Sequence, residues 1–170
     1  VGCDYKANVE RGTSTLDPVV DEPGPKAPEK FPTPGVRSIA ALEEIEGGAP
    51  AKNQIKTMVM VLDDAITLAL LRGDHRLNLQ KLQDQSGAVN IRPAEVDETI
   101  AALGASPGSL GAVGVTSMRV IADSALEGRT NMTTGANEDD WHFRGVSLQR
   151  DVEVDEWADL REVQAGETCI

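Results

Sequence analysis

The stretch Lys56–Leu71, KTMVMVLDDAITLALL, decides the fold of this 170-residue chain. Two apolar runs, residues 56–62 and 65–71, flank the polar pair Asp63-Asp64. Two such runs around a two-residue polar break predict a β-hairpin. Because both runs are nearly continuous in hydrophobicity, we expect the hairpin to be central in its sheet.

Three short helices are predicted around this hairpin. Ser38 is placed to cap the first, which Gly47-Gly48 ends. A second is expected over residues 78–82 and a third over residues 93–103, where Pro93 suits the first helical position. The third helix carries an apolar stripe at helical spacing, made up of Ala94, Val96, Ile100 and Leu103.

Further strands are predicted downstream, over residues 119–123, 131–134 and 142–148, with a short turn over residues 124–126. Strands exceed helices, and their alternation is too irregular for a doubly wound sheet. The sequence therefore predicts an α/β domain of the α+β kind, in which helices surround a mixed sheet.

The N-terminal part of the chain has a different composition. Residues 1–34 hold six of the nine prolines, which cannot sustain a helix or a central strand. We interpret residues 12–30 as an extended, mobile linker and expect the structured part to begin near Phe31. The chain begins at Val1 and not at Met, so we expect a processed protein or a piece of a longer one.

The charge balance excludes some classes of partner. With 16 Lys and Arg against 28 Asp and Glu, the net charge is −12, unlike a bulk basic nucleic-acid binder. It also disfavours an anionic membrane surface, and the apolar stretches are far below membrane-spanning length. Cys3 and Cys169 form no disulfide framework, which favours a reducing compartment, the cytoplasm.

A glycine-rich loop is the first candidate for chemistry. Residues 104–114, GASPGSLGAVG, allow several backbone amides to point one way, as in a nest for an anion or an oxyanion. The loop has neither the Gly-Lys-Ser/Thr of a phosphate-binding P-loop nor a GxGxxG pattern. The alternative is a turn-rich connection between a helix and a strand.

Single residues give weaker signals, each with an alternative. Lys56 opens an apolar strand, where its ammonium would meet a phosphate or simply extend to solvent. Asp123 ends a strand as a functional acid or as the cap of the next turn. His75 and His142 are too far apart for a local metal motif, so we expect no metal. No nucleophile elbow is present, and a cysteine nucleophile is disfavoured.

Seven blocks follow in a recognisable order: Thr33-Pro-Gly-Val, Ile55-Lys-Thr-Met-Val, Leu71-Arg-Gly-Asp-His-Arg-Leu-Asn, Pro107-Gly-Ser-Leu-Gly, Val120-Ile-Ala-Asp, Gly135-Ala-Asn-Glu-Asp-Asp-Trp-His and Asp159-Leu-Arg-Glu-Val. Together they resemble the insertion (editing) domain of bacterial prolyl-tRNA synthetase, in the aminoacyl-tRNA deacylase superfamily. The resemblance covers residues 31–166. It assigns residues 1–30 to a flank and linker from the parent catalytic domain, and residues 167–170 to the return flank.

The resemblance implies a mixed, partly barrel-like sheet and the hydrolysis of alanine mistakenly attached to proline tRNA, with prolyl-tRNA spared. It implies catalytic roles for the strand lysine and the glycine loop, which are Lys56, Gly108, Ser109, Leu110 and Gly111. It implies that substrate is bound by Thr33, Asp123, Asn137 and His142. The expected partners are the acceptor end of tRNA(Pro) and the remainder of the synthetase.

The physical logic agrees with this resemblance. A synthetic site sized for proline cannot strongly reject the smaller alanine, so a second site that admits only the smaller product is needed. Hydrolysis of an activated ester requires a placed water and oxyanion donors rather than a strong nucleophile. The editing domain is expected to need no cofactor, whereas the parent uses ATP and Mg²⁺.

One departure from the family pattern leaves a second interpretation open. Ala112 stands where the family loop has proline, which puts the rigidity of the loop in question. The alternative function is a non-catalytic insertion that supports proline activation and tRNA positioning. Because an inserted domain leaves and returns at one place, we also expect the Cys3 and Cys169 regions to lie near one another.

Overall fold

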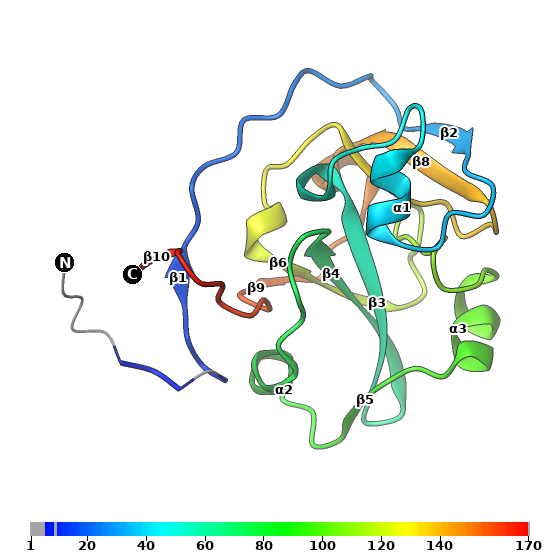
Figure 1. The fold of residues 1–170 in the computed structure, drawn as a ribbon. Coiled ribbons are helices and arrows are strands. Elements are labelled where there is room, and N and C mark those ends of the chain that lie inside the picture. The colour runs from blue at the N-terminus through cyan, green and yellow to red at the C-terminus, as the bar shows by residue number, and fades with distance from the viewer. Residues whose placement is uncertain (1–5, 9, 170) are drawn as a thin grey trace.

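The computed structural model describes residues 6–8 and 10–169, and Figure 1 shows their arrangement. The predicted hairpin is confirmed as β3 (Ile55–Leu62) and β4 (Ala65–Arg72), paired in full register from Ile55–Arg72 to Leu62–Ala65. Asp63 and Asp64 both have positive φ, 45° and 71°, as a two-residue hairpin turn of matching twist requires.

The hairpin is central in a five-stranded mixed sheet of order β5-β3-β4-β6-β9. The outer strands are β5 (Ile91–Pro93), β6 (Arg119–Asp123) and β9 (Glu156–Ala158). Strands β6 and β9 run parallel to their neighbours, and β5 is antiparallel to β3. Both faces are covered, because Leu68 and Leu70 pack into one core cluster and Ala69 into another.

A second sheet has the order β2-β8-β7 and is antiparallel. It consists of β2 (Glu29–Pro32), β7 (Met132–Gly135) and β8 (Trp141–Val146). A parallel bridge between Gln54 and Thr133 joins it to the larger sheet. The main core fills the angle between the two sheets, which gives the partly barrel-like arrangement without closing a barrel.

The helices surround these sheets as expected for an α+β domain. They are α1 (Ile39–Glu44), α2 (Leu79–Ser86), α3 (Val96–Leu103) and α4 (Leu148–Asp151), with 3₁₀ turns η1 (Ala51–Asn53) and η2 (Ser124–Leu126). Ser38 caps α1 by accepting from the amide of Ala41 at 3.1 Å. None of the described helices is long and apolar enough to cross a membrane.

The predicted helix over residues 93–103 is wrong at its start. Pro93 pairs with Met60 at the end of β5, and the amide of Ala94 donates to the carbonyl of Val59 at 2.9 Å. The helix begins only at Val96, where the carboxylate of Glu98 accepts from the amide of Glu95 at 2.8 Å. The predicted apolar stripe is only partly correct, since Ala94 and Leu103 pack against the main core, whereas Val96 is 54% and Ile100 41% exposed.

One further boundary differs from the sequence prediction, and three short strands are absent from it. The strand predicted over residues 142–148 ends at Val146, and Leu148 opens α4. The short strands β2, β5 and β9 have too few residues to show a period of two, so pattern alone does not find them.

The proline-rich segment is extended, as predicted, and runs along the top of the molecule in Figure 1. Its start forms β1 (Ser14–Thr15), which pairs with β10 (Thr168–Cys169). Farther along, Asp21 forms an ion pair with Arg129 in which both side chains are 5% exposed. These contacts hold the segment against the domain, whereas the sequence predicts a mobile linker without such contacts.

The β1–β10 pair also bears on the expected closeness of the two ends. Ser14 lies opposite Cys169, so the described N-terminal and C-terminal segments are side by side (Figure 1). Cys3 itself lies outside the described residues.

Candidate active site

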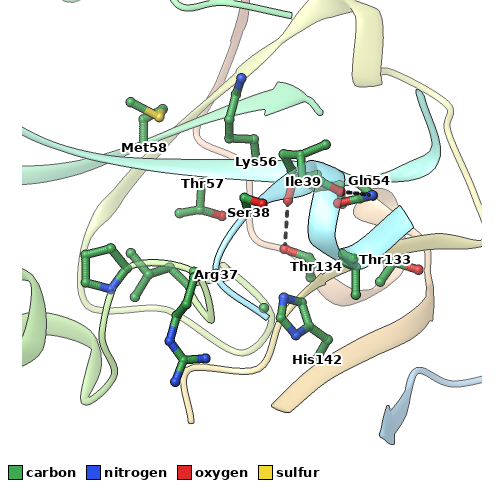
Figure 2. Close-up of a pocket in the computed structure, with 16 residues that line it drawn as sticks. Arg37, Ser38, Ile39, Gln54, Lys56, Thr57, Met58, Thr133, Thr134 and His142 are labelled. Atoms are coloured by element: carbon green, nitrogen blue, oxygen red, sulfur yellow. Dashed lines mark hydrogen bonds between the residues drawn. The ribbon is translucent and has the colours of Figure 1, made fainter. Parts of the chain in front are cut away.

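A cavity of about 360 Å³ lies where the two sheets meet, beside the Gln54–Thr133 bridge. Helix α1, strands β3, β7 and β8 and the glycine-rich loop supply its walls. Figure 2 shows this arrangement. The lining residues are Arg37, Ser38, Ile39, Leu42, Gln54, Ile55, Lys56, Thr57, Met58, Pro107, Gly108, Leu110, Thr133, Thr134, Gly135 and His142.

The apolar wall of the cavity comes from α1. Ile39 and Leu42 are one turn apart and therefore share a face of the helix. The side-chain amide of Gln54 donates to the carbonyls of Ile39 at 3.0 Å and Ala49 at 2.6 Å. These bonds fix α1 against the start of β3, so the position of the wall is determined by a buried polar contact.

His142 enters the cavity from β8 and is 4% exposed. Burial lowers its pKa below the usual value, a hydrogen bond with the Gly108 backbone opposes this, and the nearby charge of Arg37 lowers the pKa further. The ring is therefore neutral near pH 7. Thr33 lies behind it, with Oγ1 2.5 Å from Nδ1, so Thr33 supports the ring without lining the cavity.

Lys56 lines the cavity from β3, as the sequence predicts, but its ammonium extends away from His142 (Figure 2). Nζ donates to the carbonyl of His75 and lies 3.5 Å from that of Gly73. Burial lowers the pKa of Lys56, Asp74 opposes the shift and Arg76 adds to it. The turn after β4 thus holds the amine on the side of the cavity away from His142, which we call the rim (Figure 2).

The glycine-rich loop divides into two sets of residues. Gly108 and Leu110 line the cavity, whereas Ser109 and Gly111 do not. The amide of Ser109 donates to Ser106 at 3.2 Å, and that of Gly111 donates to the side chain of Asn137 at 2.8 Å. Within the described chain, the amides of Gly108 and Leu110 have no hydrogen-bond acceptor.

Besides Thr33, two more predicted substrate-binding residues do not line the cavity. Asp123 accepts from the amides of Ala125 at 3.0 Å and Leu160 at 2.8 Å, which makes it the cap of η2, the alternative that the sequence left open. Its burial raises its pKa. Asn137 is bonded to the loop backbone and does not line the cavity.

Sequence reasoning missed most of the walls, including Arg37, Ile39, Leu42, Gln54 and Thr134. Ile39 and Leu42 are recognisable only as the apolar face of a short helix, and nothing local indicates that this face borders a cavity. Among the described residues, no cluster of three His, Cys, Asp or Glu side chains is arranged to hold a metal ion.

Comparisons with known proteins identify the relatives of this chain. Residues 33–151 match the model of the family described as "Aminoacyl-tRNA editing domain". The chain is 48% identical over 169 residues to proline–tRNA ligase 1 of Anaeromyxobacter dehalogenans (strain 2CP-C), covering 98% of this chain and 29% of the relative. It is 41% identical over 165 residues to the proline–tRNA ligase of Ligilactobacillus salivarius (strain UCC118), covering 96% and 29%.

The fold is also found in solved structures. A protein titled as a putative trans-editing enzyme for prolyl-tRNA synthetase superposes with a TM-score of 0.67 at 23% identity, covering 80% of this chain and 87% of that one. The chain thus spans less than a third of the length of the ligases it matches and nearly the whole length of this structural neighbour. The chain belongs to the aminoacyl-tRNA editing domain family.

Proposed function

We propose that this editing domain hydrolyses the ester of alanyl-tRNA(Pro) and spares prolyl-tRNA(Pro). The observation that carries the proposal is the cavity itself, which is lined by the apolar side chains of α1 and by Gly108 and Leu110 of the loop, whose amides have no acceptor within the described chain. Because an alanyl group is smaller than a prolyl group, a cavity that fits only the former provides a second selection step after synthesis.

The proposed chemistry is the addition of water to the ester carbonyl. A bond forms between the water oxygen and the carbonyl carbon, and the bond to the ribose oxygen breaks. The leaving oxygen takes up a proton, and alanine and tRNA are released. The amides of Gly108 and Leu110 are the loop donors left to stabilise the oxyanion, since those of Ser109 and Gly111 already have acceptors.

Lys56 is proposed to hold the phosphate of the terminal adenosine. An ammonium has three donors, and the carbonyls of Gly73 and His75 use two. The third remains for a phosphate at the rim. Burial lowers the pKa of this amine and leaves it less strongly hydrated than an exposed lysine. Less free energy is therefore lost in removing water from the amine when it binds an anion.

The setting of this activity is part of the proposal. The net charge of −12 is unfavourable for tRNA affinity, so the remainder of a proline–tRNA ligase is proposed to bind the tRNA. A tether to that ligase raises the effective concentration of the acceptor end at the cavity. We propose that the reaction takes place in the cytoplasm. The ligase would use ATP and Mg²⁺, and the hydrolysis would need no cofactor.

The proposal is tested by binding of non-hydrolysable analogues, in which alanine or proline is joined by an amide to 3′-amino-3′-deoxyadenosine. The alanyl analogue should shift the NMR signals of Gly108, Leu110 and His142, and the prolyl analogue should not. Ile39→Ala should admit the prolyl analogue, whereas Ile45→Ala, just beyond α1 and outside the cavity, should not. Equal binding of both analogues to the unmodified chain would contradict size selection.

A further inference from the structure

The turn between β7 and β8, residues 136–140, lies against the glycine-rich loop. Asn137 in this turn has a φ of 53°, in the left-handed region that asparagine tolerates better than most residues. This backbone conformation directs both the amide nitrogen and the side chain of Asn137 at the loop, as its hydrogen bonds show.

Asn137 makes three hydrogen bonds with the loop. Its side-chain oxygen accepts from the amide of Gly111 at 2.8 Å, and its side-chain nitrogen donates to the carbonyl of the same residue at 2.9 Å. Its own amide donates to the carbonyl of Ser109 at 2.8 Å. The carboxamide therefore imitates a neighbouring strand and satisfies both polar groups of Gly111.

Close packing reinforces these bonds. A Cβ on Gly111 would lie 2.0 Å from the carbonyl oxygen of Gly135, and a Cβ on Gly135 would lie 2.2 Å from the carbonyl carbon of Ser109. At the other end of the loop, the carboxylate of Asp139 accepts from the amide of Ser106 at 2.8 Å. The loop is thus fixed at both ends, and its cavity-lining residues Gly108 and Leu110 have amides with no acceptor within the described part of the chain.

We propose that Asn137 is a positioning residue, which holds the loop so that the amides of Gly108 and Leu110 are fixed as oxyanion donors. The inference rests on the proposed hydrolysis, because the donors have a role only in that reaction. It replaces direct substrate binding by Asn137. It also supplies a source of loop rigidity beside Ala112, which is buried in the core at 2% exposure but leaves the backbone without the restriction of a proline.

A purely structural role would affect stability alone, so the test needs readouts at the loop. Asn137→Gly keeps the left-handed conformation at no steric cost and removes both side-chain bonds. Asn131→Gly is a matched control: Asn131 has a φ of 52° in the turn before β7, is similarly half-buried, and makes no side-chain hydrogen bond within the described structure. Both variants lose one carboxamide at a left-handed position.

Two measurements are made on each variant of this chain: hydrogen exchange of the Gly111 amide by NMR, and steady-state deacylation of alanyl-tRNA(Pro). Asn137→Gly should speed the exchange of Gly111 at least about tenfold and lower kcat about 10- to 100-fold with KM nearly unchanged, because misplaced donors act on the transition state. Asn131→Gly should leave exchange at Gly111, kcat and KM unchanged.

The proposal is overturned if Asn137→Gly leaves either exchange at Gly111 or kcat unchanged, or if both variants reduce kcat equally. Failure of the proposed function gives a different pattern, in which the unmodified chain itself does not release alanine. In that case, faster exchange at Gly111 in Asn137→Gly would show that Asn137 holds the loop in place. Its proposed role in catalysis would be wrong, because the reaction itself would be absent.

Discussion

The hydroxyl of Thr33 lies 2.5 Å from Nδ1 of His142, and the two side chains are 0% and 4% exposed. Thr33 directly follows β2, whose Phe31 pairs with His142 on β8. The chain that enters the domain therefore fixes the histidine that borders the cavity. The entry segment is part of the site and not only a connection to it.

Thr33→Val should lower the free energy of unfolding by about 1–3 kcal/mol, because it leaves a buried ring nitrogen without a partner. Thr57→Val is the matched control, since Oγ1 of Thr57 is buried with no hydrogen-bond partner in the described chain. Removing that hydroxyl should cause no loss. Urea denaturation near pH 7 measures both, and equal losses would show that the Thr33–His142 bond contributes nothing specific.

His75 should make the domain less stable in acid. It is 1% exposed, neither ring nitrogen has a hydrogen-bond partner in the described chain, and its pKa is lowered from 6.5 to about 4. Burial is the main cause, Arg72 and Arg161 add to it, and Asp74 and Glu167 oppose it. Between these two pKa values the unfolded chain binds a proton at His75 and the folded chain does not. The contribution of neutral His75 to the free energy of unfolding is therefore fully present above pH 6.5 and is lost as the pH falls towards 4.

His75→Leu removes this titration. Between about pH 7 and about pH 4.5, the unmodified chain should lose about 2 kcal/mol more of its unfolding free energy than the variant. Acid-sensitive groups that do not interact with His75 are common to both proteins and cancel in the comparison, whereas the pKa of Asp74, which His75 helps to lower, differs between them. Parallel losses in the two urea titrations would mean that His75 is not held neutral in the folded state.

Gly111→Ala should displace the loop, because its Cβ would lie 2.0 Å from the carbonyl oxygen of Gly135. The φ of Gly111 is not positive, so the effect is one of space and not of backbone conformation. We expect deacylation to fall by about tenfold or more and stability by about 1–3 kcal/mol. Gly12→Ala, where the nearest atoms are 3.5 Å away, should change neither quantity. Full activity in Gly111→Ala would exclude a fixed loop.

Asp21→Ala should release the proline-rich segment from the domain. The carboxylate accepts from Nε of Arg129 at 2.7 Å, from Nη2 at 2.8 Å, and from the amide of Thr130 at 2.9 Å. Its loss leaves a buried guanidinium unpaired and should cost about 3 kcal/mol. Glu29→Ala breaks the exposed Glu29–Arg144 pair and should leave stability nearly unchanged. Thermal unfolding and limited proteolysis at residues 16–28 measure the difference.

The sequence predicts the hairpin, the capped helix after Ser38 and the strand ending at Asp123, because each is encoded in neighbouring residues. It does not predict β2, β5 and β9, which form by pairing with strands already in place. The observed start of α3 differs from the predicted one because Pro93 suits both the first turn of a helix and an edge strand.

The site shows the same division. Four residues that belong to motifs of the family line one cavity: Lys56, Gly108, Leu110 and His142. Ile39, Leu42 and Gln54 have no local signal, since only the tertiary fold brings α1 against β3. Asp123 and Asn137 also belong to such motifs, yet their side chains bond to the backbone and do not line the cavity. Which of the two a motif residue does depends on the direction of its side chain.

The central claim is tested most directly by deacylation of alanyl-tRNA(Pro) and prolyl-tRNA(Pro), with this chain at a concentration high enough to offset weak tRNA affinity. Lys56→Met tests the rim lysine, and Lys52→Met, an exposed lysine outside the cavity, is its control. We predict release of alanine alone, lost at least about tenfold in Lys56→Met and retained in Lys52→Met. Equal release of alanine and proline, or full activity in Lys56→Met, would contradict the account.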